Sequence, residues 1–504
     1  DDSLVGGLGI DTASYAGATA AVTANVSGLG RASGGAGTDS LSGIENLLGS
    51  SHKDGLTGNA SANRLDGGSG NDTLIGGTGA DNMLGGTGDD LFSVDNIADL
   101  TRESASGGLD TVQSSADFVL GANVENLRLL GAADIKGTGN SLANTLWAAA
   151  GNNILDGAGG IDTASYADSA AGVAASLTSR NASGGSGNDM LLNFENLVGS
   201  SHDDYLTGNS LVNMLDGGAG ADTLKGGAGA DTLAGGAGSD LYYVDDVGDL
   251  VVETGSNLAA GVDMVYTSVD YQLTANVENL RITSSADVDV TGNSKGNLIF
   301  SGTGSNVIDA GAGRDTLSYL YTGAAVKISL QAAGIAQVTG GSGTDTLYSI
   351  ENLDGSNYGD TLDGNAASNV LNGGNGNDVL KGRGDTDWLD GGAGRDRLIG
   401  GTARDELKGG LGADIFEYNS IAETKPGGSR FEWDIIVDFS HDEGDRIDLY
   451  SIDADLALAG NQAFVFIEAS GFTAAGQVLY DSSTGMLYGN VNADSDAEFA
   501  IYLL

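Results

Sequence analysis

Aspartates at a fixed position of a nine-residue repeat are the residues of this chain best suited to chemistry. The repeat first appears over residues 65–73 as LDGGSGNDT, an apolar residue followed by a glycine-rich hexad that ends in Asp72. The aspartate supplies a hard anionic oxygen, which suits calcium. The glycines permit a tight turn that other residues would resist. The spacing therefore predicts cation binding at turns.

The same frame returns in tandem, which indicates how the turns are positioned. It continues at Leu74 and Met83, recurs from residue 215 to 240, and recurs again from residue 371 to 414. Each apolar residue is expected to point inward from a short strand. Two nonapeptides, roughly 18 residues, then complete one coil of a right-handed parallel β-roll, so Asp72 should lie above Asp90 and opposite Asp81. Carboxylates and glycine carbonyls of stacked turns can surround an ion at about 2.3–2.6 Å.

The nonapeptides lie inside a larger duplication of roughly 150 residues, a sign of a repeat architecture. The segment DTASYA occurs at 11–16 and 162–167, and more loosely at 315–319. A glycine-rich hexad and the motif ENL follow it each time, ending at residues 47, 197 and 353. We predict three repeat modules, at 1–153, 154–306 and 307–415, and a different terminal domain at 416–504, in which aromatic and β-branched residues replace glycine.

Composition agrees with an ordered, acidic chain. The 504 residues include 85 glycines, yet 40% are hydrophobic and recur with the repeat, which favours a buried stripe over disorder. The net charge of −48 would repel nucleic acid and anionic membranes. A solvated acidic surface is the alternative to a set of bound cations. There is no cysteine and no apolar run of about 18 residues, so neither thiolate metal sites nor membrane insertion is expected.

Folding is expected to depend on calcium. Each coil buries a pair of leucine-type side chains, worth about 2–3 kcal/mol each. Ordering the backbone costs about 1–2 kcal/mol per residue, and rows of aspartate repel one another. Calcium turns that repulsion into coordination and so couples binding to folding. Without calcium, disorder becomes the better prediction.

The tandem hexads closely resemble those of the RTX family of calcium-binding proteins, whose repeat is GGxGxDxUx, where U is a large apolar residue. The resemblance implies an all-β, parallel β-roll that binds multiple Ca²⁺ ions. In the tandem turns it implies calcium ligation by Asp72, Asp81, Asp90, Asp222, Asp231, Asp240, Asp378, Asp396 and Asp414. The implied glycine positions are Gly67, Gly70, Gly76, Gly79, Gly217, Gly220, Gly226, Gly229, Gly373, Gly376, Gly391 and Gly394. The single hexads add Asp11, Asp39, Asp162, Asp189, Asp315 and Asp345.

Several turns depart from the pattern. The hexads that end in Asp387 and Asp405 differ at the fourth position, so either weak binding or a purely structural role is open for them. Asparagine replaces the ligand aspartate at residues 63, 213 and 369, which favours ion-free spacers because an amide contributes no charge. For the preceding turns, which end in aspartate at residues 54, 204 and 360, both an ion and no ion are open.

Residues 416–504 resemble the C-terminal region of serralysin-type secreted proteins. The resemblance rests on acidic residues 494–498 followed by the apolar end FAIYLL at 499–504. It implies a β-rich cap and a signal for the type I secretion machinery. A last strand that covers the end of the solenoid explains the same residues, and both readings can hold together.

No catalytic constellation is found in the sequence. The three histidines, His52, His202 and His441, form no HExxH motif, and neither a GxSxG elbow nor a phosphate-binding loop is present. We predict a secreted structural or cell-surface protein: an adhesin, a surface-layer component or an extracellular filament. Self-association and a cell-surface polysaccharide are the partners left open. The alternative is the calcium-binding and export region of a larger secreted enzyme, such as a polysaccharide epimerase, lyase or protease, because the chain starts within a repeat.

Overall fold

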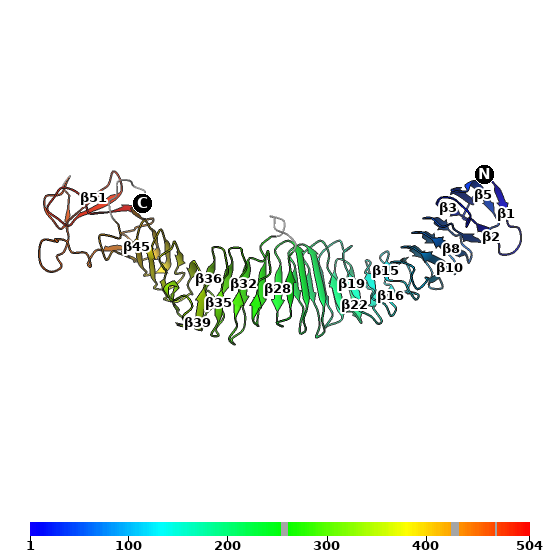
Figure 1. The fold of residues 1–504 in the computed structure, drawn as a ribbon, viewed down its shortest axis with the longest axis horizontal. Coiled ribbons are helices and arrows are strands. Elements are labelled where there is room, and N and C mark those ends of the chain that lie inside the picture. Colours follow the sequence, from blue (N-terminus) through cyan, green and yellow to red (C-terminus); the bar gives the residue numbers. More distant parts are fainter. Residues whose placement is uncertain (254–260, 425–432, 469–470) are drawn as a thin grey trace. The chain divides into compact units, whose positions relative to one another are not determined.

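The computed structural model describes residues 1–253, 261–424, 433–468 and 471–504. They form two compact units, Asp1–Asp263 and Met264–Leu504. Both units are stacks of short, mostly parallel strands (Figure 1). A single 3₁₀ turn, η1 (Leu330–Ala332), is the only helix in the described residues. The prediction of an all-β parallel β-roll is therefore confirmed.

The strands of the first unit form three sheets. In order of hydrogen bonding, the first contains β1 (Ser3–Val5), β5 (Gly37–Ser42), β4 (Arg31–Gly34), β3 (Val22–Asn25), β7 (Gly55–Thr57), β9 (Thr73–Ile75), β11 (Leu91–Val94), β13 (Thr111–Ser114), β15 (Asn126–Leu129), β17 (Thr145–Trp147), β19 (Thr163–Ser165), β23 (Asn196–Val198), β25 (Met214–Ala219), β27 (Thr232–Ala237) and β29 (Leu250–Val252). The second contains β12 (Leu100–Arg102), β10 (Asn82–Thr87), β8 (Arg64–Ser69), β6 (Asn46–Leu48) and β2 (Thr12–Ser14). The third contains β14 (Phe118–Val119), β16 (Lys136–Thr138), β18 (Ile154–Asp156), β20 (Val173–Ser176), β21 (Asn181–Gly184), β22 (Gly187–Leu192), β24 (Tyr205–Thr207), β26 (Thr223–Lys225) and β28 (Leu241–Val244).

The second unit repeats this arrangement. Its longest sheet contains β30 (Met264–Thr267), β32 (Asn279–Ile282), β34 (Leu298–Phe300), β36 (Thr316–Ser318), β40 (Asn352–Asp354), β42 (Val370–Asn372), β44 (Trp388–Gly394), β46 (Glu406–Gly412), β48 (Asp434–Ile436), β50 (Val465–Ile467), β51 (Gln477–Asp481), β52 (Met486–Asn490) and β53 (Phe499–Leu503). Another contains β31 (Tyr271–Gln272), β33 (Val290–Thr291), β35 (Val307–Asp309), β39 (Gly343–Tyr348) and β38 (Gln337–Gly340). The last contains β37 (Lys327–Ser329), β41 (Thr361–Asp363), β43 (Val379–Gly384), β45 (Arg397–Thr402), β47 (Ile415–Glu417) and β49 (Arg446–Asp448).

The core is a narrow stripe to which the short strands contribute one or two apolar side chains each. Leu65 of β8 pairs in register with Met83 of β10, and Leu74 of β9 pairs with Phe92 of β11. All four side chains are fully buried. Strand alternation directs the intervening residues outward. Alternate nonapeptides therefore stack, and the expectation that two of them complete one coil is confirmed.

Antiparallel hairpins interrupt the parallel stacking in each predicted module. Strand β4 pairs antiparallel with β3 and β5, and β21 does so with β20 and β22. In the third module β38 pairs antiparallel with β39. The single hexads at 34–39, 184–189 and 340–345 fall on these hairpins. They therefore do not form the stacked turn of the tandem hexads, although they follow the same sequence pattern.

The C-terminal strands close the second unit. Strand β53 pairs parallel with β48 and antiparallel with β52. Phe499, Ala500 and Ile501 of β53 are fully buried. The apolar end of the chain is therefore part of the fold, as the cap interpretation requires. Within the described ranges, no helix has the length and apolar character needed to cross a bilayer.

Candidate metal centre

The repeat aspartates form ladders along the edges of the roll. The backbone N–H of Asp54 donates to Oδ1 of Asp72, and that of Asp72 donates to Oδ1 of Asp90, both at 2.7 Å and 18 residues apart. Asp81 belongs to a second ladder, in which its N–H donates to Oδ1 of Asp99 at 2.8 Å. The expected stacking of Asp72 on Asp90 is therefore confirmed. Each stacked aspartate uses one carboxylate oxygen to accept a backbone hydrogen bond from the preceding turn of its ladder.

The other carboxylate oxygen is buried and lacks a hydrogen-bond donor. Oδ2 of Asp72, Asp81 and Asp90 has no partner among the described residues, and these side chains are no more than 2% exposed. Within the described part of the chain, the Oδ2 atom is likewise buried without a partner in Asp11, Asp162, Asp222, Asp231, Asp240, Asp315, Asp378, Asp387, Asp396, Asp405 and Asp414. Burying an unpaired anion is costly unless a cation compensates it. These oxygens therefore fit a metal, and a donor set made only of oxygen fits calcium.

The first glycine of each hexad leaves room for this carboxylate. A Cβ added at Gly67, Gly76 or Gly217 would lie within 3.0 Å of Oδ2 of the aspartate five residues later. The same applies at Gly226, Gly373 and Gly391. At the fourth position of the hexad, glycine is favoured by the backbone conformation. Gly70 has φ of +112°, in the left-handed region. Positive φ angles in that region are also found at Gly220, Gly229, Gly376 and Gly394. Gly79 lies outside that region, but a Cβ there would meet the carbonyl oxygen of Ser61 at 2.7 Å.

The two degenerate hexads keep the regular turn. Asp385 and Ala403 occupy the fourth position at φ of 63° and 85°, so non-glycine residues adopt the left-handed conformation there. The N–H of Asp387 donates to Oδ1 of Asp405 at 2.8 Å, as in the regular ladders. Both turns thus have the same buried Oδ2 as the neighbouring turns. The sequence alone left open whether these two turns bind an ion weakly or have a purely structural role.

Burial raises the pKa of the ladder carboxyls. The pKa of Asp72 rises to about 7, mainly by desolvation, with the charges of Asp90 and Asp54 adding to it. The pKa of Asp222 and that of Asp396 also rise to about 7 by burial. Hydrogen bonds from the ladder N–H groups act in the opposite direction but do not cancel the effect. Near neutral pH the charged carboxylates therefore oppose the fold unless a counter-ion is bound.

Other turns supply protein donors in place of a cation. Ser50 donates from its N–H to Oδ2 of Asp54 and from its Oγ to Oδ1 at 2.9 Å. The pairs Ser200–Asp204 and Ser356–Asp360 repeat this pattern. Asn63 accepts the N–H of Asn59 at 2.7 Å and donates to the carbonyl of Glu45 at 2.6 Å. These contacts favour ion-free turns at the asparagines, as predicted, and also at the three aspartates for which both outcomes were open.

The single hexads are mixed. Oδ1 of Asp39, Asp189 and Asp345 accepts the backbone N–H of a preceding coil at 2.7–3.0 Å, so these residues do join the ladders. However, Oδ2 of Asp345 accepts hydrogen bonds from Ser342 Oγ at 3.0 Å and from the Tyr319 hydroxyl at 3.2 Å. Asp345 therefore fits a metal less well than the tandem aspartates.

Glutamates of the recurrent motif ENL complete the ladders, a role that was not predicted for them. Oε2 of Glu45, Glu195 and Glu351 accepts the N–H of Asp11, Asp162 and Asp315, each at 2.9 Å. The partners are 33–36 residues apart because a hairpin lies between them. A longer side chain thus replaces aspartate where the 18-residue spacing is broken. Only the recurrence of ENL in every module could have signalled this role.

A parallel β-roll with buried, donor-free carboxylate oxygens at its stacked turns belongs to the class of cation-binding solenoids. A family model described as RTX calcium-binding nonapeptide repeat (4 copies) matches residues 57–92, 138–164, 207–242, 291–319, 354–389 and 381–416. These stretches match RTX calcium-binding nonapeptide repeats, and such repeats imply calcium binding.

Comparison with solved structures found 28 matching chains. One is the solution structure of the AlgE6R3 subunit from the Azotobacter vinelandii mannuronan C5-epimerase. It is 26% identical over 29% of this chain and 71% of its own length, with a TM-score of 0.13. The comparison with curated proteins gave no match.

Proposed function

We propose that this chain is a secreted calcium-binding β-roll that folds on binding calcium outside the cell and serves a structural or cell-surface role. An adhesin, a surface-layer component and an extracellular filament are the forms that this role can take. The observation that carries the proposal is the row of buried Oδ2 atoms without donors, which follows the RTX repeats along both units.

Export follows from the same electrostatics. With a net charge of −48 and its repeat carboxylates uncompensated, the chain stays unfolded where calcium is scarce. An unfolded chain suits passage through the type I secretion machinery, which RTX repeat proteins typically use. Calcium outside the cell then drives folding, because binding and ordering are coupled. Self-association and a cell-surface polysaccharide remain the proposed partners.

Circular dichroism of the full chain tests the calcium switch. We expect β-structure in millimolar calcium, its loss after chelation, and its return when calcium, but not magnesium, is restored. Magnesium is the matched control because it has the same charge but demands shorter, octahedral coordination. A spectrum that stays β-rich in chelator would contradict the proposal. The structural role is tested separately, by electron microscopy of assemblies formed with calcium.

A further inference from the structure

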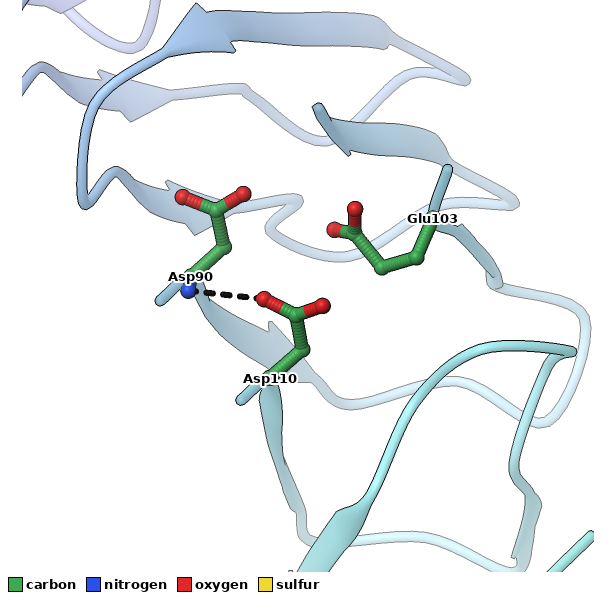
Figure 2. A group of neighbouring side chains, drawn as sticks. All are labelled: Asp90, Glu103 and Asp110. Carbon is green, nitrogen blue, oxygen red and sulfur yellow. Dashed lines mark hydrogen bonds between the residues drawn. The ribbon is translucent and has the colours of Figure 1, made fainter. Parts of the chain in front are cut away.

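A carboxylate cluster lies at the end of the first tandem array, outside any pair of stacked hexads. Asp90 ends the last hexad of that array, Glu103 follows β12, and Asp110 precedes β13. One oxygen of each residue lies within 4.8 Å of those of the other two. The three carboxyl groups face a common space (Figure 2). Glu103 and Asp110 belong to no nonapeptide and were not among the predicted ligands.

Each member of this cluster uses one oxygen on the backbone and leaves the other without a donor. The N–H of Asp90 donates to Oδ1 of Asp110 at 2.8 Å, and the N–H of Gly86 donates to Oε2 of Glu103 at 3.1 Å. Oδ2 of Asp90, Oε1 of Glu103 and Oδ2 of Asp110 are buried and have no hydrogen-bond partner in the described residues. Asp90 is 2% exposed and Asp110 is fully buried. Three donor-free anionic oxygens thus converge away from water.

Two glycines keep the space between these carboxylates open. A Cβ at Gly85 would lie within 3.0 Å of both Glu103 Oε1 and Asp90 Oδ2. A Cβ at Gly107 would lie within 3.0 Å of Glu103 Oε2 and Asp110 Oδ2. Side chains at either position would push the carboxylates apart. Their convergence therefore depends on small residues on both sides of the cluster.

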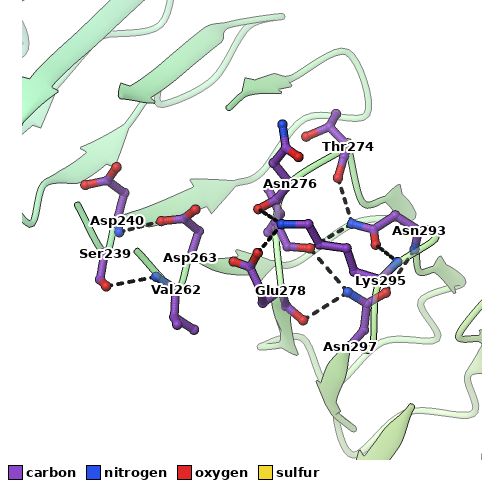
Figure 3. Close-up of polar contacts among 11 residues, drawn as sticks. Ser239, Asp240, Val262, Asp263, Thr274, Asn276, Glu278, Asn293, Lys295 and Asn297 are labelled. Carbon is purple, nitrogen blue, oxygen red and sulfur yellow. Dashed lines mark hydrogen bonds and ion pairs between the residues drawn. The ribbon is translucent and has the colours of Figure 1, made fainter. Parts of the chain in front are cut away.

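The second module contains the same cluster, built from Asp240, Glu253 and Asp263. The N–H of Asp240 donates to Oδ1 of Asp263 at 2.9 Å, as Asp90 does to Asp110 (Figure 3). The paired aspartates are 23 residues apart here and 20 residues apart in the first module. The arrangement of acids is thus kept although the connecting segment changes length, which a chance cluster would not explain.

We propose that Asp90, Glu103 and Asp110 form a calcium site that ends the first array, with an equivalent site in the second module. The proposal rests on the proposed function and adds a site that the nonapeptide pattern does not contain. Calcium–oxygen distances of about 2.3–2.6 Å place opposite ligands about 5 Å apart, close to the observed limit. Magnesium at about 2.0–2.1 Å would require a tighter cluster. The bound ion links residues 91–110, which do not follow the nine-residue repeat, to the last regular turn of the array.

Calcium counting by native mass spectrometry tests this site in the full chain. Glu103→Gln removes one carboxylate and keeps the side-chain length; we expect one calcium fewer than in the parent at saturating calcium. Asp89→Asn is the matched control, because it removes the same charge from an exposed neighbouring residue, and it should retain the full count. An unchanged count in folded Glu103→Gln overturns the inference. A parent chain that binds no calcium overturns the proposed function instead.

Anomalous scattering from crystals of the unsubstituted chain grown with calcium does not depend on how the variant folds. We expect a peak between Asp90, Glu103 and Asp110 in addition to those at the stacked hexads. Peaks at the hexads with none in this cluster would reject the inference while leaving the proposed function intact.

Discussion

The ladder through Asp72 and Asp90 in the first array and the ladder through Asp396 and Asp414 in the third end differently, although their interior turns are alike. At the end of the first array, Asp90, Glu103 and Asp110 converge with donor-free oxygens. At the end of the third, Asp445 accepts the N–H of Asp414 at 2.9 Å and that of Ser440 at 2.7 Å. Asp438 there accepts the N–H groups of Gly409 and Gly410 at 2.9 and 2.8 Å.

The same type of ladder can thus be ended by a cation or by backbone donors. Each N–H that reaches a carboxylate replaces part of what a cation would supply. The ladder end at Asp90, Glu103 and Asp110 therefore depends on calcium more strongly than the ladder end at Asp445. The same contrast separates the donor-free tandem turns from the Ser50–Asp54 type of turn.

Hydrogen exchange at limiting calcium should reveal the largest difference between the two endings. As calcium is lowered, we expect the amides of residues 100–114 to lose protection before those of residues 438–449. A site that is filled at about 100 times its dissociation constant contributes about 2.7 kcal/mol, so its loss should speed exchange roughly 100-fold. Pulse labelling of the intact chain, followed by quenching, proteolysis and mass spectrometry of the peptides, measures both segments in one sample. Equal loss of protection in both segments would remove the contrast.

The calcium-free chain should regain β-structure when the pH is lowered. Burial raises the pKa of Asp72 to about 7 and that of Asp81 and Asp90 to about 6, all above the unfolded value of 3.8. Between pH 3.8 and about 7 the folded state therefore binds more protons than the unfolded state, and its stability falls as the pH rises through this range. Circular dichroism of calcium-stripped protein between pH 4.5 and 7.5, an interval of about three units chosen around these pKa values, measures this effect. Saturating calcium should abolish this pH dependence. A β-signal that rises with pH in the absence of calcium would contradict the expected direction of the effect.

A pair of isosteric substitutions distinguishes donor-free turns from hydrogen-bonded ones. Asp72→Asn should destabilise the chain by about 1–3 kcal/mol in calcium, because a ligand is lost, yet stabilise it without calcium, because a buried charge is removed. Asp54→Asn faces the amide toward the donors of Ser50 and should cost a similar amount in both conditions. Urea unfolding with and without calcium measures the four values. The interpretation fails if Asp72→Asn has the same sign in both conditions.

The coil was predictable because its determinants are local and periodic. Leu65, Leu74 and Met83 mark the buried stripe, and the glycines mark the turns. The fold can therefore be predicted from the residue types within the nine-residue repeat. The frame also located the ladder aspartates. It could not distinguish the hexad at 34–39 from the one at 67–72, because only the strands paired with each decide between a hairpin and a stacked turn.

Glu103 and Asp110 were missed for a related reason. They lie outside the frame, and their oxygens meet that of Asp90 only because β12 and β13 pair with β10 and β11. A weak signal was present: the second module has Glu253 and Asp263 in the matching segment, at a different spacing. Comparison of the modules, rather than of the nonapeptides, would have found it.

Among the differences between the two array ends with acidic clusters, an aromatic side chain gives the smallest expected effect. The hydroxyl of Tyr242 donates to Oε1 of Glu253, whereas Phe92 of the first module has no hydroxyl to offer Glu103. A donor on a carboxylate oxygen competes with a cation for it. Tyr242→Phe should therefore tighten calcium binding at the second cluster by up to roughly fivefold, the equivalent of a hydrogen bond worth about 1 kcal/mol. Tyr243→Phe is the matched control, because it keeps the ring that lies 4.1 Å from Lys225 Nζ. Calcium titration that finds weaker binding in Tyr242→Phe would mean that the hydroxyl orients Glu253 toward the ion and does not compete with it.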